Sequence, residues 1–591
     1  MIYTDAGGIM YINLVKSKTS RRGTMVYLAE GYRVNGKCRH RNLKCYGYLE
    51  ELQKDEPGVL ERLKTEARKM TEDSLIDLVI NLSAPLGNAE IPLNFGYFCL
   101  DAIYSSLGIS EFLKNENRKT KINYDLDQIM KLLVFSRIMN PASKKEAYER
   151  KNGFFNLAFD FSMDDMYRSL TRMKDFKEEL ELWIHNQIKA QYGRDATLVF
   201  YDVTNYYFET EREDDDEIDE ESNKITDAGL RKKGVSKEHR PEPIIQMGLF
   251  IDSQGLPIAY KLFPGNMNDK VTLVPVLEAV KEKYRLGRTI VVADKGLNSG
   301  NNLLYIRSKG DGYIVSQPIR KRKKEMIETV LDANGYVGNP DGTFKMKDWL
   351  SEREIKDRDG NIQILKEKTI CFWSKEFEER EKYKREGLEE SIAKFQKNPA
   401  LYTASNSFGV KKYLKEKELN KETGEIRSKH PVLIFDEEKY RRDCALDGYY
   451  MLVTSELDLT NEEILDKYRG LWKIEDSFRI IKSDLEGRPV YVRTKDHIEA
   501  HFLTCFIALV IMRLLQNRLA NQYSAEQIKE SLNRANAQLI DKGIYLIQNP
   551  GKPFNEISAS LNFQVENKYI RFEKLKNLHR NMKLVNITQL S

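Results

Sequence analysis

The sequence predicts an α/β fold organised around a mixed sheet, and three stretches support this prediction. Residues 198–202 and 289–294 are short apolar runs that each end in an aspartate, which is typical of buried strands. A third stretch begins at Thr460 and repeats apolar residues at the spacing of an amphipathic helix. Between the first two we expect, in order, a strand at 245–251, a turn at 253–255, a strand at 257–263 and a helix at 271–284.

The composition indicates a globular chain with an uneven charge distribution. Its 591 residues suggest roughly three to five domains. Hydrophobic residues at 41% and charged residues at 31% provide enough material for a core. Residues 209–221 hold ten acidic side chains and one arginine, so the net charge of +5 leaves +14 on the rest of the chain. That basic excess suits a polyanionic partner.

The cysteine and hydropathy patterns favour a cytoplasmic protein. Six cysteines are scattered without a CxxC pair, which argues against a zinc site and against a disulfide framework. The start of the chain shows no pattern of a secretory signal. The most apolar segment, 502–515, is shorter than the roughly 20 residues that a membrane span needs. Because it also contains Arg513, we expect a buried helix and no membrane partner.

The N-terminal region, residues 1–115, is predicted to be β-rich and basic, with a linker helix at its end. Strand-like runs lead to Asn35-Gly36, a strong signal for a tight hairpin turn. Residues 16–44 contain nine Lys or Arg and one Glu. Such a basic ribbon can lie along DNA phosphates or enter the major groove, with Arg39 and Arg41 as candidate contacts. The alternative is a solvated cationic surface.

Residues 120–190 are predicted to be helical. A helix that starts after Ser162 has a polar, basic face containing Arg168 and Arg172. Short helices with tight connections resemble a helix-turn-helix reader, in which these arginines would bind DNA. The alternative is a helical subdomain that only supports the rest of the fold.

The helix predicted from Thr460 carries a second line of residues beside its apolar stripe. Tyr468 and Lys482 each lie seven residues from Glu475, so on an ideal helix all three project in nearly the same direction. A salt-bridged amphipathic helix would explain these residues equally well if they stood alone. Asp202 and Asp294 at the ends of their strands favour a chemical role, because a strand fixes the backbone while the carboxylate reaches out of the core.

These three motifs together resemble the DDE triad of bacterial insertion-sequence transposases. The matching segments are YDVTNYYFE around Asp202, VVADKG around Asp294 and YRGLWKIEDSFRIIK around Glu475. The resemblance is to the branch whose third motif is Tyr-x2-Arg-x3-Glu-x6-Lys, which Tyr468, Glu475 and Lys482 match at full spacing. The arginine position holds Leu471, and the cation could instead come from a neighbour on the same stretch: Arg469, Lys473 or Arg479.

The resemblance implies a ribonuclease H-like mixed sheet as the catalytic core. This core would comprise residues 195–318 and 446–520. A β-containing insertion, 319–445, would interrupt it, and a C-terminal helical region, 521–591, would follow. Transposases of this branch carry such an insertion, and its opening basic cluster at 320–324 would clamp DNA ends.

The resemblance also implies the chemistry. Asp202, Asp294 and Glu475 would hold two Mg²⁺ ions, with Mn²⁺ as a substitute, because oxygen ligands select hard cations. Lys482, Tyr468, Lys473 and Arg479 would contact DNA. The function expected is cleavage at terminal inverted repeats and strand transfer into target DNA, by a homodimer. The alternatives are a metal-dependent nuclease of the same fold without strand transfer, and a transposase-derived DNA-binding protein.

Two weaker patterns invite a metal interpretation. The acidic run at 211–221 has many carboxylates, but like charges repel, and we expect a solvated, extended loop. His497 and His501 are four apart on a helix, a spacing that can ligate zinc. The acidic residue of this segment is Glu499 and does not directly follow the first histidine, so a polar helix face is favoured.

Overall fold

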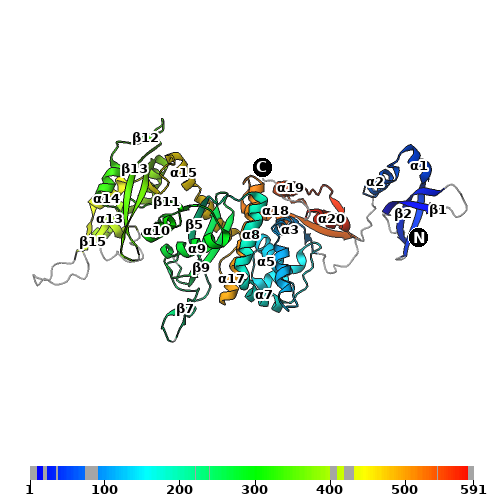
Figure 1. The fold of residues 1–591 in the computed structure, drawn as a ribbon, viewed down its shortest axis with the longest axis horizontal. Helices are drawn as coiled ribbons and strands as arrows, with labels where there is room; N and C mark the ends of the chain where they lie inside the picture. The colour runs from blue at the N-terminus through cyan, green and yellow to red at the C-terminus, as the bar shows by residue number, and fades with distance from the viewer. Residues whose placement is uncertain are drawn as a thin grey trace, which may run out of the picture. The chain divides into compact units, whose positions relative to one another are not determined.

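The computed structural model forms two compact units, residues 1–90 and 91–591 (Figure 1). It describes residues 9–16, 23–34, 37–72, 91–219, 221–238, 240–357, 359–398, 409–417, 432–541 and 543–582.

The first unit is a three-stranded antiparallel sheet covered by two helices. Its elements are β1 (Ile9–Lys16), β2 (Thr24–Val34), β3 (Lys37–Tyr48), α1 (Leu49–Asp55) and α2 (Val59–Glu72). Val26, Val59 and Leu63 form its small core. The predicted strands are confirmed; the two hairpin residues Asn35 and Gly36 lie outside the described residues, but Val34 pairs with Lys37 across them.

The second unit contains a nine-stranded mixed sheet in the order β12-β13-β14-β17-β11-β10-β5-β8-β9. Its strands are β5 (Leu198–Tyr207), β8 (Ile244–Asp252), β9 (Pro257–Pro264), β10 (Ile290–Ala293), β11 (Gly312–Ser316), β12 (Val337–Gly338), β13 (Phe344–Lys356), β14 (Ile362–Ser374) and β17 (Tyr449–Thr454). β8 runs antiparallel to both β5 and β9, whereas β10 is parallel to both β5 and β11. The five strands from β9 to β11 therefore have the order expected of a ribonuclease H-like core.

The sheet separates two layers of helices. On one face, Val199, Tyr201 and Val203 of β5 share a core with α9 (Leu273–Tyr284) and α10 (Gly300–Ser308). On the other face, Phe200 and Tyr206 pack with the helices that follow β17. This alternation is the period-two pattern of a strand buried on both sides.

The insertion between β11 and β17 extends the sheet. β13 and β14 form a long hairpin, and β14 pairs with β17, which in turn pairs with β11. The other described elements of the insertion are α11 (Lys324–Leu331), α12 (Lys375–Arg385), α13 (Leu388–Lys397), β15 (Leu414–Lys417), β16 (Val432–Phe435) and α14 (Glu437–Ala445). The predicted β content is present, and it is continuous with the central sheet.

The helical region that precedes the sheet packs around one long helix, α17 (Lys495–Arg518). It comprises α3 (Tyr97–Ser106), α4 (Ile109–Arg118), α5 (Leu126–Met139), α6 (Lys144–Glu149), α7 (Met163–Asp175) and α8 (Lys177–Tyr192). α17 contacts α3, α5 and α7. By length and composition α17 could cross a membrane, but 94% of its apolar window is buried inside the protein, as expected for a core helix.

The region after residue 521 differs from the helical prediction. It contains α18 (Ala525–Arg534), α19 (Lys552–Ser560) and α20 (Phe572–Met582), but also β18 (Asn536–Asp541), β19 (Ile544–Ile547) and β20 (Tyr569–Arg571). These strands form a sheet with β4 (Leu93–Asn94) from the start of the unit. Gly543, at φ +81°, supplies the left-handed backbone that the short β18–β19 connection needs.

The stretch predicted as one long helix from Thr460 is broken. The Thr460 and Glu463 capping box begins α15 (Asn461–Arg469) as expected, and α16 (Trp472–Arg479) follows after a two-residue turn. Gly470 in that turn lies so close to the ring of Phe200 that a Cβ there would be 2.5 Å from Cζ. A π-helical turn, Ile480–Asp484, ends the segment.

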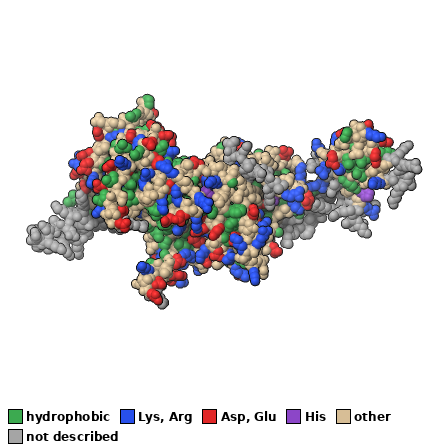
Figure 2. All heavy atoms as spheres, viewed as in Figure 1, with side chains coloured by type: hydrophobic (Ala, Val, Ile, Leu, Met, Phe, Trp, Pro, Cys, Tyr) green, Lys and Arg blue, Asp and Glu red, His purple; other side chains and the backbone are tan. Residues whose placement is uncertain are grey.

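The described residues of the acidic run are mostly exposed to solvent, as predicted, but the run forms an arm with a short hairpin and not a wholly extended loop. β6 (Glu217–Ile218) and β7 (Ile225–Asp227) pair as a hairpin, which projects from the sheet in Figure 1 and carries red acidic side chains in Figure 2. Ion pairs across its base join Asp214 to Arg231 at 2.5 Å and Asp216 to Lys232 at 2.9 Å. These cations follow the run in sequence and offset the repulsion on which the prediction rested.

Candidate active site

The strand register brings Asp202 and Asp294 to the same level of the sheet. β5 and β10 are parallel neighbours in which Phe200 faces Val292. Two residues further along each strand, Asp202 and Asp294 are therefore adjacent and on the same face, the one that Phe200 and Val292 share. Both side chains are half-buried.

Glu475 reaches this face from helix α16. The helix contacts β5 and β8 and buries Ile474 and Phe478 in the core that contains Phe200. Glu475 lies on the exposed side of this packed stripe. All three predicted carboxylates thus lie on one side of the sheet.

Asp294 is held by two hydroxyl groups. Ser316 Oγ, at the end of β11, donates to Asp294 Oδ1 at 2.7 Å, and the phenol of Tyr468 approaches the same oxygen at 3.5 Å. Burial is the main cause that raises the pKa of Tyr468, and the charges of Asp294 and Glu475 raise it further. Tyr468 therefore stays a neutral hydrogen-bond donor beside the two acids.

The electrostatics of Asp202 connect the three acids. Burial raises the pKa of Asp202 to about 6, the nearby Lys237 ammonium opposes this rise, and the charges of Asp294 and Glu475 add to it. Like charges raise a carboxyl pKa only when they lie close by. The charge of Asp202 is thus coupled to those of Asp294 and Glu475, and the strand register aligns it with Asp294.

The donor chemistry of this group fits a hard divalent cation. All three side chains offer carboxylate oxygens, and a bound cation would offset the repulsion that Asp294 and Glu475 exert on Asp202, which Lys237 also opposes. Within the described part of the chain, no three Asp, Glu, His or Cys side chains are already gathered closely enough to form a metal cage. Binding an ion would therefore require the carboxylates to draw together.

A cavity of about 860 Å³ opens beside Asp294 and Glu475. It lies between helices α15 and α16 and the elements of the insertion. Aromatic and cationic side chains line it, and they are Phe344, Phe372, Phe377, Tyr449, Tyr450, Tyr468, Trp472, Lys295, Arg320, Lys321, Arg380, Lys384 and Arg469. Such a lining suits nucleic acid, because cations attract phosphates and aromatic faces stack on bases.

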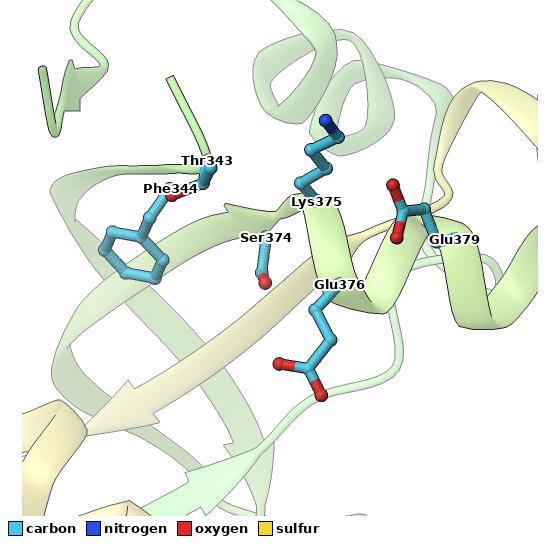
Figure 3. A pocket seen from close by; sticks show the side chains of 6 residues that line it. All are labelled: Thr343, Phe344, Ser374, Lys375, Glu376 and Glu379. Carbon is cyan, nitrogen blue, oxygen red and sulfur yellow. The ribbon is translucent and has the colours of Figure 1, made fainter. Parts of the chain in front are cut away.

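A second hollow, of about 370 Å³, lies where β14 ends and α12 begins. Figure 3 shows Glu376 and Glu379 projecting from α12, opposite Thr343 and Phe344. None of the three predicted acids lines it. Its two carboxylates disfavour a phosphate, and we assign no chemistry to it.

The other predicted contacts on the Glu475 stretch point in different directions. Lys473 donates to the backbone oxygen of Ser253 at 2.5 Å, in the β8–β9 turn, and does not line the cavity. Arg479 pairs with Asp476 and Asp484 at 2.9 and 3.0 Å. An ideal helix would align these side chains in one direction. The break at Gly470 and the π-helical turn change their directions, so they do not form a single line.

Lys482 lies away from the cavity, beside the end of β5. Its ammonium is 3.4 Å from Glu238 Oε1 and 5.5 Å from the ring centroid of Tyr206. Burial lowers the pKa of Lys482 to about 8, and the charge of Glu238 opposes this fall. Near neutral pH the side chain is therefore still mostly a cation.

The four predicted arginines of the N-terminal half are all at the surface or close to it. Arg168 pairs with Asp164 at 2.7 Å and Arg172 with Asp175 at 2.6 Å, so local acids partly compensate the charge of helix α7. The buried side of that helix packs against α17 in the main core. In the first unit, Arg39 and Arg41 are exposed on β3, and Arg41 pairs with Glu30 at 2.7 Å.

The histidine pair of α17 does not form a metal site. His501 is buried and contacts Lys144 Nζ at 3.3 Å and the backbone oxygen of Gly487 at 3.0 Å. His497 lies near Thr171, at 3.5 Å. Separate partners hold the two rings, and His501 lies in the core and not on the polar helix face that the sequence favoured.

Several residues at the site have no obvious signal in the sequence. Ser316 ends β11, a short apolar run in the sequence, and could have been found by pairing that strand with the one before Asp294. Lys237 follows the acidic arm, and only the fold brings its ammonium to the backbone oxygen of Val203, at 2.6 Å. Arg513, on α17, donates hydrogen bonds to the backbone and side chains around Glu475. In the sequence it is only a charged residue within an apolar segment.

Two protein-family models match the chain. A transposase DDE domain matches residues 218–511, which include Asp294 and Glu475, and an N-terminal domain of IS1634 family transposases matches residues 14–75. Together they cover more than half of the chain. The comparison with curated protein sequences gave no match.

Two solved structures show distant similarity. A synaptic complex of piggyBac transposase with hairpin DNA is 6% identical, with 83% of this chain and 87% of that chain covered and a TM-score of 0.35. A paired-end complex of Mos1 transposase with a left transposon end is 13% identical, with 32% and 57% covered and a TM-score of 0.14.

Proposed function

The chain belongs to the DDE transposases of bacterial insertion sequences, and we propose that Asp202, Asp294 and Glu475 are the carboxylates with which it cuts and joins DNA. Enzymes of this family carry out cut-and-paste transposition with divalent metal ions. One observation supports the assignment of the site: Asp202 and Asp294 follow the same register on neighbouring parallel strands, and helix α16 brings Glu475 to that face, where Asp294 and Glu475 line one cavity.

We propose two Mg²⁺ ions as the cofactor, with Mn²⁺ as a substitute, bound by these three carboxylates. When bound, the ions supply an activated water or 3′-hydroxyl and stabilise the leaving oxygen of the phosphodiester. Ser316 and Tyr468 hold Asp294 in place through its Oδ1. As a neutral donor, Tyr468 can also offer its hydroxyl hydrogen to a phosphate oxygen.

The cavity beside the acids is proposed as the entry for the DNA end. Its cations include Arg469 and Arg380, which supply positive charge near the position where Leu471 replaces the arginine of the third motif. Leu471 itself is buried and contributes only an apolar wall. The other DNA contacts that we propose are Lys482 and Arg479 on the stretch that follows Glu475, and Arg168 and Arg172 on α7.

The first unit is proposed to bind the terminal inverted repeats. The basic strand β3 presents Arg39 and Arg41 to solvent, and the family match to residues 14–75 places this unit in a transposase N-terminal domain. Two copies of the chain would be needed to bring the two DNA ends of the insertion sequence together. We therefore propose a homodimer in the DNA complex.

Single substitutions of the acids test the proposal. Asp202→Asn, Asp294→Asn and Glu475→Gln should each abolish Mg²⁺-dependent strand cleavage while DNA binding persists, because each removes one ligand charge without changing side-chain size. Cleavage and strand transfer are measured on labelled DNA carrying the ends of the element from which the chain derives.

Glu462→Gln serves as the matched control, since Glu462 is an exposed acid in the first turn of α15 and should keep full cleavage. Retained cleavage in any triad variant would remove that residue from the site. If the wild type cleaves DNA but forms no strand-transfer product, the protein would be a metal-dependent nuclease of the same fold.

A further inference from the structure

Four cations gather at the end of β5, beyond Asp202. The Arg240 and Arg488 guanidinium groups lie 4.0 and 5.8 Å from the ring centroid of Tyr207. The Lys482 ammonium lies 5.5 Å from the ring centroid of the preceding Tyr206. The fourth, Lys237, binds the backbone oxygen of Val203, the residue after Asp202. We call Lys237, Arg240, Lys482 and Arg488 the β5 cation cluster.

One carboxylate, Glu238, lies within this cluster. Its Oε1 forms an ion pair with Arg488 and lies 3.4 Å from Lys482 Nζ. Its Oε2 is buried and has no hydrogen-bond partner among the described residues. The anion is therefore bound on one oxygen and unsatisfied on the other.

The cations are close enough to affect one another. Burial is the largest cause of the lowered pKa of Lys482, and the charges of Arg488 and Lys237 lower it further, whereas Glu238 alone opposes the change. Lys482, Arg488 and Lys237 together with the single carboxylate of Glu238 leave an excess of positive charge. A cluster of this kind favours an anion with more charge and more acceptor oxygens than a carboxylate has.

A DNA phosphate has the required chemistry. It offers two acceptor oxygens that an arginine and a lysine can share, as Arg488 and Lys482 share Glu238. The cluster also adjoins the catalytic face, since Lys237 binds next to Asp202 and influences its charge. The Glu238 side chain is itself 27% exposed, so it is accessible from the surface.

We propose that the β5 cation cluster binds a backbone phosphate of the DNA strand that enters the active site, and that Glu238 occupies this phosphate position in the DNA-free protein. The proposal rests on the DNA-cleaving function assigned above. It assigns binding roles to Lys237, Arg240 and Arg488, and it assigns to Glu238 the role of an internal competitor that DNA must displace.

The affinity of the full-length protein for DNA tests this assignment. A fluorescent mixed-sequence duplex is titrated in EDTA, so that no cleavage occurs, over a series of salt concentrations. Glu238→Gln should tighten binding about fivefold at low salt, because the competing charge is gone and the side chain keeps its size. Arg488→Gln should weaken binding and lower the salt dependence by about one released counterion.

Glu221→Gln is the matched control, because Glu221 is an exposed acid on the arm and its loss changes the net charge equally. It should leave affinity nearly unchanged. A double variant gives the sharper result: if Glu238 competes at Arg488, the gain from Glu238→Gln should shrink in the Arg488→Gln background. Thermal unfolding of each variant shows that the fold is kept.

Two results would overturn the proposal. Equal affinities of Glu238→Gln and Glu221→Gln would show that Glu238 does not compete with DNA. Weaker binding by Glu238→Gln would show that Glu238 instead supports the cations. Failure of the proposed function is a separate outcome, seen as duplex binding by a wild type that does not cleave element ends in Mg²⁺.

Discussion

At the scale of single residues, the position of Glu475 depends on Arg513, which lies 38 positions later in the sequence. The buried Arg513 guanidinium donates to the backbone oxygen of Lys473 at 2.9 Å and to Ser477 Oγ at 2.8 Å, and it pairs with Asp476 at 2.8 Å. These partners flank Glu475 on α16. Helix α16 is short, because it lies between a turn and a π-helical turn, and its own backbone hydrogen bonds stabilise it only weakly. The contacts of Arg513, which we call the Arg513 clamp, therefore help to fix its position.

Replacing Arg513 should therefore impair cleavage, although we propose no contact between Arg513 and DNA. We expect Arg513→Met to lower the cleavage rate roughly 100-fold, since small displacements of a catalytic group are costly. Arg513→Lys keeps the charge near Asp476 but loses the planar fork, and it should retain an intermediate rate. The rates are measured at saturating DNA, together with the Mg²⁺ concentration for half-maximal cleavage, which should rise.

The matched control is Arg534→Met, because Arg534 pairs only at the surface of α18, with Glu530 at 3.4 Å. It should cleave like the wild type. A folded Arg513→Met protein with an unchanged rate and Mg²⁺ requirement would show that the clamp does not position Glu475.

At the scale of elements, the segment after α16 is anchored by buried cations. Lys144 on α6 contacts His501 on α17, and His501 holds the backbone oxygen of Gly487. Arg137 on α5 donates to the backbone oxygens of Leu485 and Glu486 at 3.3 and 3.2 Å. Three helices thus fix the chain between the π-helical turn and the β5 cation cluster.

The buried ammonium of this anchor makes stability depend on pH. Burial lowers the pKa of Lys144 from its ordinary 10.5 to about 7, Arg137 lowers it further and Cys505 opposes this. Between pH 7 and 10.5 the folded protein therefore binds fewer protons at this site than the unfolded chain does. The contribution of Lys144 to the free energy of unfolding consequently rises with pH across this window, by at most about 1.4 kcal/mol per pH unit.

Lys144→Met should reduce this rise, because methionine does not titrate. Urea unfolding of the wild type and the variant at several pH values between 7 and 10 measures the two slopes. A constant loss of stability from the missing contact to His501 would shift the variant without changing its slope. Equal slopes in the two proteins would mean that Lys144 keeps an ordinary pKa in the fold.

At the scale of the whole molecule, the sequence predicts single strands and helices, whose patterns are local. It does not predict contacts between segments that are far apart in the chain. The apolar runs before Asp202 and Asp294 predict their strands because each pattern is complete within a few residues. The break at Gly470 could not be predicted, since it depends on the ring of Phe200, some 270 positions away. Arg513 and Lys237 likewise reach the site only through packing of distant segments.

The insertion shows the same division between local and long-range information. The apolar and aromatic run at 369–373 indicates a strand, β14, but only its pairing with β13 and β17 makes the insertion a part of the central sheet. The order of the acidic arm depends on Arg231 and Lys232, beyond the run itself. The sequence thus predicts the fold class and the candidate acids. It does not predict the side chains that contact those acids and position them.

The proposed function depends on one metal-binding site formed by Asp202, Asp294 and Glu475. Anomalous diffraction from crystals of the full-length protein soaked in Mn²⁺ tests this most directly, because the ion itself is located. We expect anomalous density between the three carboxylates, and its loss in Asp202→Asn crystals. Density elsewhere, or none at these side chains in a wild type that cleaves DNA in Mn²⁺, would contradict it.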